Sequence, residues 1–190
     1  MKKFVSAAVI GGLLFAASAH ASDGTITFTG SVTANSCTIK INGGSATATV
    51  ALPAVSSSQL DAAGKTAGST KITFDLADCV SGDAAATGAV KAFFEAGANV
   101  DVASGRLNNT ASGTGAAKNV QLELVNSDDS VIKVGDVSSI KGGTLTAGAA
   151  PNDKKSSAQF AYAVRYFKSG ADAVGAGTVS SSVTYSVVYQ

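Results

Sequence analysis

The sequence is poor in the side chains that most enzymes use for catalysis. Its 190 residues include no Trp, one Met, one His, two Cys and two Pro, and 14% of them are charged. The one histidine, His20, lies in an N-terminal segment with the pattern of a signal peptide. A mature chain without histidine excludes Ser-His-Asp and Cys-His catalysis, and it excludes a His-ligated zinc site.

The first 21 residues have the features of a secretory signal peptide. Two lysines follow Met1, residues 4–19 are apolar with two glycines, and Ala-His-Ala at 19–21 places small residues around a cleavage site. A membrane span is the alternative, but the apolar run is short for a bilayer and polar residues 22–24 follow it directly. We therefore predict a signal peptide at 1–21 and a mature chain of 22–190.

The mature chain is nearly neutral. Removing the signal peptide takes two lysines and no acids, so 14 basic and 13 acidic side chains become 12 and 13, a net charge of −1. Binding to nucleic acid needs a basic face, and this balance gives no sign of one. The remaining length suits one domain of ordinary size with its own hydrophobic core.

The mature chain keeps two cysteines, Cys37 and Cys79. In an exported protein an even pair of cysteines indicates one disulfide, and two free buried thiols are the alternative. The closed loop would hold roughly forty residues, for which the chain-entropy model gives about 4 kcal/mol of stabilisation.

Short runs of alternating polar and apolar residues fill the mature sequence, separated by Gly, Asn, Asp and Ser. They lie at 25–32, 37–41, 46–52, 69–79, 89–97, 119–126, 157–167 and 177–189. Residues 54–67 are compatible with a short helical turn. Many short strands with polar turns between them favour an all-β sandwich in one domain.

Three segments suggest chemistry but have simpler interpretations. Asp75 and Asp78 are three residues apart on a strand, which predicts opposite faces and therefore no shared substrate. Asp128-Asp129 is typical of a hairpin turn. The run GTGAAK at 113–118 faintly resembles a phosphate loop, but a helix must follow such a loop, and here a strand-like run follows.

A strand-like segment with one apolar face stands near each end of the mature chain. Near the C-terminus, one face is apolar except for Ser181, and the other is polar until Val188. The apolar face consists of Val179, Val183, Tyr185, Val187 and Tyr189. Near the N-terminus one face carries Ile26, Phe28, Gly30 and Val32, and the other carries threonines and Ser31. On this pattern alone, both segments could simply belong to the chain's own sandwich.

Taken together, these residues resemble the chaperone–usher pilins of Gram-negative bacteria, of the type 1 pilus subunit kind. The run Ile26-x-Phe28-x-Gly30-x-Val32 is similar to the pilin donor segment, and the two cysteines follow it as in that family. The stretch FAYAVRYFKSGADAVGAG at 160–177 and the penultimate Tyr189 are also similar. The resemblance covers essentially the whole mature chain. One departure is Val174, where many relatives have proline, which puts only the local turn shape in doubt.

The resemblance implies an incomplete immunoglobulin-like β-sandwich that lacks its last strand. It implies a donor-strand extension at 22–35, a pilin domain at 36–190, and a structural pilus subunit that polymerises by donor-strand exchange. The implied donor residues are Ile26, Phe28, Gly30 and Val32. The implied acceptor groove, which also contacts the chaperone, consists of Gly177, Val179, Val183, Tyr185, Val187 and Tyr189.

The resemblance also implies the partners. These are copies of the chain, other pilus subunits, a periplasmic chaperone that lends a strand to the groove and binds the C-terminal carboxylate, and an outer-membrane usher. Neither nucleic acid, membrane insertion, a cofactor nor catalysis is expected, and the implied location is a fimbrium on the cell surface, reached through the periplasm. The alternative is an exported single-domain β-sandwich that binds a receptor or carbohydrate as a minor adhesive subunit.

Overall fold

A computed structural model describes residues 25–149 and 153–190, so the predicted signal peptide lies outside the described residues. The chain divides into two units, Met1–Val32 and Thr33–Gln190, and every described strand belongs to the second. In the part of the chain that the structure describes, no helix is long and apolar enough to cross a membrane.

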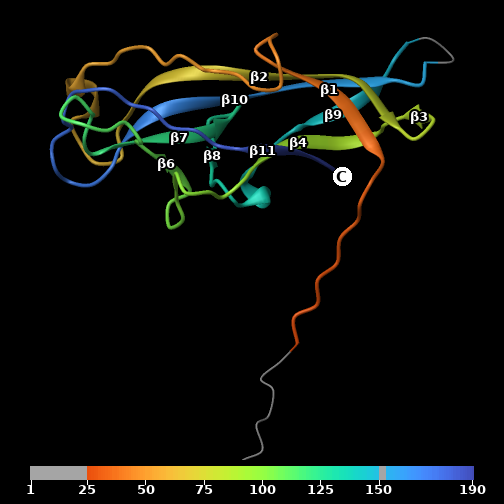
Figure 1. The fold of residues 1–190 in the computed structure, drawn as a ribbon, viewed down its shortest axis with the longest axis horizontal. Coiled ribbons are helices and arrows are strands. Elements are labelled where there is room, and N and C mark those ends of the chain that lie inside the picture. Colours follow the sequence, from red (N-terminus) through yellow and green to blue (C-terminus); the bar gives the residue numbers. More distant parts are fainter. Residues whose placement is uncertain (1–24, 150–152) are drawn as a thin grey trace, which may run out of the picture. The chain divides into compact units, whose positions relative to one another are not determined.

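The unit Thr33–Gln190 is an all-β sandwich, as predicted (Figure 1). Its strands are β1 Asn35–Ile41, β2 Thr66–Ser81, β3 Ala84–Ala85, β4 Gly88–Phe94, β5 Val100–Asp101, β6 Arg106–Asn108, β7 Val120–Asn126, β8 Val131–Ile132, β9 Gly143–Ala147, β10 Ser156–Lys168 and β11 Tyr185–Tyr189. Two 3-10 turns, η1 Ser57–Leu60 and η2 Val137–Ser139, lie between strands.

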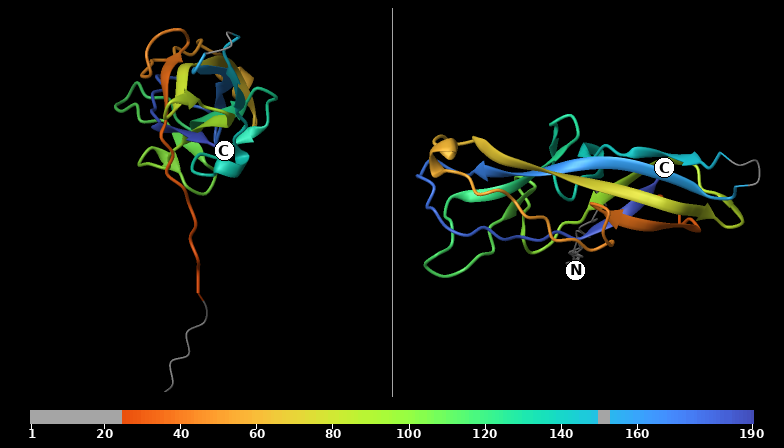
Figure 2. Two further views of the ribbon diagram at one scale, coloured as in Figure 1. Left: turned by 90° about the vertical axis from the view of Figure 1, so that its right-hand side faces the viewer. Right: turned by 90° about the horizontal axis from the view of Figure 1, so that it is seen from above.

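The long strands β2 and β10 pair antiparallel and form the spine of one layer (Figure 2). On its other side, β10 pairs with β7 and, near Ser156, with β9. Strand β9 also pairs with β4, and β4 pairs with β11, so β9 connects the two layers. Among the described strands, β1 pairs only with β2 and β11 only with β4. Each of these two outer strands therefore has one free edge.

The core between the layers is built around a cluster of aromatic rings. Phe74 of β2 stacks on Phe160 of β10 with ring centroids 5.4 Å apart, and it meets Tyr162, Phe94 and Tyr185 edge-on. The Tyr162 hydroxyl donates to the Lys141 carbonyl at 2.7 Å and lies 3.2 Å from the Ala92 amide nitrogen, which donates to it. Burial raises the pKa of Tyr162 to about 12. This one side chain therefore ties β10 to β4.

Most of the predicted elements are confirmed. The runs at 37–41, 69–79, 89–97, 119–126 and 157–167 correspond to β1, β2, β4, β7 and β10, and the predicted helical turn is η1. Asp128-Asp129 lies in the turn between β7 and β8, where Asp129 has a φ of 64° and the Asn126 amide donates to the Ser130 carbonyl. The run at 113–118 is a loop, and β7 follows it.

Two predictions are wrong. Residues 46–52 form no strand, although Val50 and Leu52 pack against the core, because no described strand pairs with them. Asp75 and Asp78 are not on opposite faces. The backbone at Asp78 has a φ of 53°, and the pairing of β1 and β10 with β2 shifts register nearby, so Leu76 and Cys79 both point inward. The two aspartates still form no common site, since they bond separately to Gln159 and Lys155.

Candidate functional site

The backbone of residues 178–190 is paired on one side only. Even-numbered residues bond to loop 109–117, to Asn99, to Glu95 and, in β11, to β4; Gln190 and Ala89 exchange bonds of 2.8 and 3.0 Å. In an antiparallel ladder, hydrogen-bonded and non-hydrogen-bonded residues alternate. The amides and carbonyls of the odd-numbered residues therefore point to the free edge.

The same odd-numbered residues carry the apolar side chains of this segment. Each of them is partly buried, namely Val179, Ser181, Val183, Tyr185, Val187 and Tyr189, whereas Thr178, Ser180, Ser182, Thr184 and Ser186 are exposed. The alternation predicted for 177–189 is thus present. The regular strand is shorter than predicted, because Asn109 side-chain bonds to Thr178 and Ser180 replace a ladder there.

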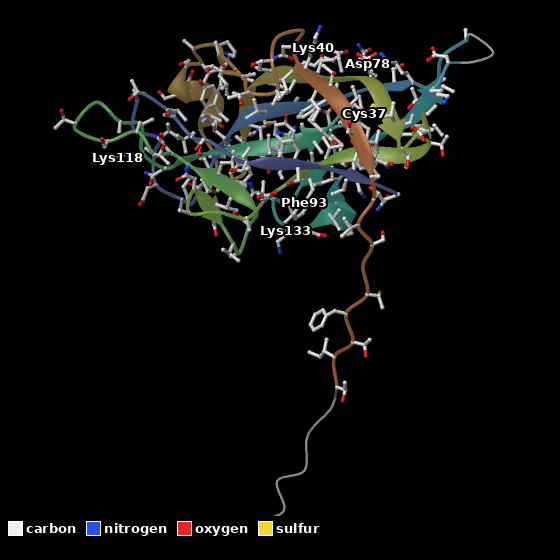
Figure 3. All side chains as sticks on the ribbon, turned by 45° about the vertical axis from the view of Figure 1, so that its right-hand side comes forward. Cys37, Lys40, Asp78, Phe93, Lys118 and Lys133 are labelled. Carbon is white, nitrogen blue, oxygen red and sulfur yellow. A yellow bond between two sulfur atoms is a disulfide. The ribbon has the colours of Figure 1, made fainter. Side chains whose placement is uncertain are left out.

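The facing wall consists of β1 and the segment 46–52 beyond it. Along β1, partly buried Cys37 and Ile39 alternate with exposed residues such as Lys40 (Figure 3). Val50 and Leu52 continue this wall, and all four apolar side chains pack against the core while staying partly accessible. Sequence reasoning missed this wall, although the alternation at 37–41 was visible in the sequence.

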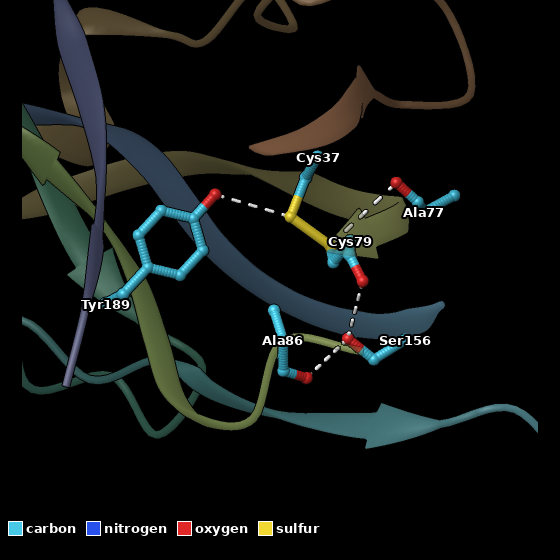
Figure 4. Close-up of a disulfide and its surroundings, with 6 residues drawn as sticks. All are labelled: Cys37, Ala77, Cys79, Ala86, Ser156 and Tyr189. Carbon is cyan, nitrogen blue, oxygen red and sulfur yellow. Dashed lines mark hydrogen bonds between the residues drawn. A yellow bond between two sulfur atoms is a disulfide. The ribbon is translucent and has the colours of Figure 1, made fainter. Parts of the chain in front are cut away.

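Two tyrosine side chains bridge the walls. The Tyr185 hydroxyl donates to the Ala46 carbonyl at 2.8 Å, and the Tyr189 hydroxyl lies 3.3 Å from Cys37 Sγ (Figure 4). Burial raises the pKa of both hydroxyls. No ladder joins β1 to β11 in the described chain, yet a tyrosine spans the gap, which fits the space of one additional strand. We call this strip, between β1 with 46–52 and the edge of 178–189, the acceptor groove.

The predicted disulfide is present and supports one wall of the acceptor groove. Cys37 of β1 is bonded to Cys79 of β2, which is fully buried (Figure 4). The Ser156 hydroxyl donates to the Ala86 carbonyl at 2.6 Å and lies 3.2 Å from the Cys79 carbonyl. The bond therefore fixes the β1 wall to the long central strands.

A cavity of about 320 Å³ lies beside the acceptor groove at the 177–179 end of the C-terminal segment. It is lined mainly by apolar groups, among them Leu52, Leu60, Tyr166 and Val179. Gly177 borders it, and a Cβ at this position would lie 2.4 Å from the Gly115 carbonyl oxygen. Glycine is therefore needed there for the close approach of two backbone segments.

The segment 25–34 has neither helix nor strand within its own chain. Ile26, Phe28 and Val32 are 80%, 87% and 102% exposed, the highest values among the large apolar side chains of the described residues. Gly30 has open space where a Cβ would stand. These residues have the alternation of a half-buried strand and no partner strand in the described chain. No group of three His, Cys, Asp or Glu residues in 25–149 and 153–190 could hold a metal ion.

Comparison with known proteins assigns the family. A family model described as type-1 fimbrial protein matches residues 52–190. The chain belongs to the type-1 fimbrial protein family. This fimbrial subunit is 38% identical to the major fimbrial subunit SMF-1 of Stenotrophomonas maltophilia, over 90% of this chain and 95% of that protein. It is also 38% identical to the F17 fimbrial protein of Escherichia coli, over 94% and 96% of the two chains.

Solved structures support the fold of the fimbrial subunit. The P pilus rod subunit PapA matches with a TM-score of 0.52 and 24% identity, over 80% of this chain and 99% of that chain. A subunit from the structure of a chaperone–usher pilus gives a TM-score of 0.52 at 22% identity, over 89% and 96% of the chains. The chain is thus a structural pilus subunit with the incomplete immunoglobulin-like pilin fold.

Proposed function

We propose that the fimbrial subunit polymerises by donor-strand exchange, in which residues 25–34 of one copy occupy the acceptor groove of the next. In this assignment the donor residues are Ile26, Phe28, Gly30 and Val32. The groove residues are Val179, Val183, Tyr185, Val187 and Tyr189, with Gly177 at one end and Cys37 and Ile39 on the facing wall. The extension is 22–35 and the pilin domain 36–190.

The observation that carries the proposal is the match between two incomplete parts. The acceptor groove presents unpaired amides and carbonyls next to partly buried apolar side chains, and such an edge is a template for an added strand. The segment 25–34 presents exposed apolar side chains at alternate positions without a partner. Each part supplies what the other lacks.

The energetics favour this pairing. Burying Ile26, Phe28 and Val32 would contribute roughly 5–8 kcal/mol, at about 1.5–3 kcal/mol for each large apolar side chain. Each added backbone hydrogen bond contributes about 1 kcal/mol more. Gly30 has no side chain and so permits close approach of the donor backbone where the groove is shallow.

The proposed partners are those of the family. A periplasmic chaperone lends a strand to the empty acceptor groove and binds the C-terminal carboxylate, and an outer-membrane usher exchanges that strand for the extension of the next subunit. The assembled fimbrium stands on the cell surface, and the subunit itself catalyses no reaction. The alternative, a single-domain receptor- or carbohydrate-binding protein, is not better supported.

Deleting residues 25–34 tests the proposal. We expect the shortened chain to keep its disulfide and to bind a synthetic peptide of residues 22–34, because its acceptor groove is intact. We expect no fibres from it by electron microscopy. Fibres of normal length from the shortened chain would contradict the proposal.

A further inference from the structure

Ser181 is the one polar side chain in the groove-facing row from Val179 to Tyr189. Its Oγ atom is shielded from solvent and has no hydrogen-bond partner. It is the only such buried side-chain atom among the described residues. Buried hydroxyls in folded proteins nearly always have a partner, and an unpaired one is costly. The hydroxyl therefore indicates a missing partner on the groove side.

The donor segment has a matching irregularity. Its inward row is Ile26, Phe28, Gly30 and Val32, so one position without a side chain is flanked by large apolar residues. The acceptor row around Ser181 has the same form, because Val179 and Val183 flank the one polar position. Both rows have the two-residue period of a β-strand.

We propose that Gly30 of a neighbouring copy lies opposite Ser181, and that the Ser181 hydroxyl bonds to the donor main chain beside Gly30. This assignment rests on the proposed donor-strand exchange. Without a side chain at Gly30, the hydroxyl can reach the donor backbone directly. One change of χ1 rotamer turns the hydroxyl toward the groove. Ser181 is then the residue that sets the register of the donor strand.

The alternatives to this register are distinguishable by what they place on Ser181. A slip by two residues in either direction puts Phe28 or Val32 over the hydroxyl, which leaves it buried against an apolar side chain. The same slip wastes Gly30 against Val179 or Val183, where an apolar contact is available. The pairing of Gly30 with Ser181 holds for either direction of the donor strand, since Phe28 and Val32 then face the two valines.

Disulfide trapping in assembled fibres tests the register. The full chain with Gly30→Cys and Ser181→Cys should give covalent ladders on a denaturing gel without reductant, because opposed strand residues have disulfide-compatible spacing. Gly30→Cys with Val179→Cys, or with Val183→Cys, provides the matched control for a two-residue slip. We expect the control ladders to be roughly tenfold weaker, the factor that corresponds to one unpaired buried hydroxyl.

The outcomes separate the two proposals. A ladder from either control pair that exceeds the Ser181 ladder overturns the register and leaves donor-strand exchange standing. Fibres without a ladder from any of the three pairs overturn donor-strand exchange itself. Mass spectrometry of the linked peptides excludes exchange with the native Cys37–Cys79 bond.

A second set of variants keeps Gly30 in place, in case a side chain there blocks assembly. Val32→Cys is combined in turn with Val179→Cys, Ser181→Cys and Val183→Cys. If Gly30 faces Ser181, Val32 faces one of the two valines, so we expect a ladder with one of them and none with Ser181→Cys. A ladder between positions 32 and 181 overturns the register.

Discussion

Replacing Phe28 by Asp separates the donation of a strand from the folding of the subunit. Phe28 is 87% exposed in the single chain, so the substitution should change the stability of its own subunit by no more than about 0.5 kcal/mol. In the fibre, the same position is proposed to be buried in the next copy. There the change removes about 2–3 kcal/mol of apolar burial. It also adds a cost of several kcal/mol for an unpaired buried charge.

A combined loss of about 5 kcal/mol lowers the occupancy of the acceptor groove by more than roughly a thousandfold. We expect the Phe28→Asp chain to fold, bind chaperone and accept a donor strand, but not to donate one. Electron microscopy should show short fibres or none, while periplasmic levels of the chaperone-bound subunit stay normal. Added as peptides, residues 22–34 should fill the groove of a subunit without its own extension, and the Asp version should not.

The control is Thr27→Asp, because Thr27 lies on the opposite face of the donor segment and its charge would stay in water. Its effect on fibres should be much milder. Unfolding of the chaperone-bound Phe28→Asp subunit would place this residue in its own core. Fibres as long as those of the unaltered chain would remove it from the interface. Either result refutes the reasoning.

Three further predictions concern the body of the subunit. Removing residues 187–190 should abolish chaperone capture and lead to degradation in the periplasm, and a normal periplasmic level of the shortened chain would contradict the open groove. Replacing Cys37 and Cys79 by Ser should lower the free energy of unfolding by about 4 kcal/mol, as measured with denaturant on the peptide-filled subunit. The pKa of Tyr162 is raised from 10.0 to about 12, so its neutral form is stabilised by folding. Its contribution to stability should be complete below pH 10 and decline as pH rises from 10 toward 12, and Tyr162→Phe should remove that part of the alkaline loss.

Local patterning was sufficient to predict the paired strands. In β10 the buried residues Ala158, Phe160, Tyr162 and Val164 alternate with more accessible ones, and this period is visible in the sequence. The short strand β9 was missed because GTLTA offers one buried side chain, Leu145, and no alternation to detect. The bulge at Asp78 was missed because a single residue with positive φ leaves no signal in a pattern of period two.

The site was only half predictable, for a physical reason. A strand pattern says that a segment can pair, and says nothing of where its partner lies. Residues 25–32 and 46–52 both have the pattern and form no strand in the described chain. The groove-facing row near the C-terminus was predicted from alternation, but the facing wall at Cys37 and Ile39 depends on tertiary packing. The unpaired hydroxyl of Ser181 is likewise visible only once its surroundings are known.

The central claim is that the strand missing from one subunit comes from the next. A cryo-electron microscopy map of fibres assembled from the unaltered chain tests it most directly. The account predicts a continuous strand between β1 and β11 of every internal subunit, with side-chain density of residues 25–34 and a connection to the neighbouring copy. An acceptor groove that is empty, or filled by the subunit's own residues 25–34, would contradict it.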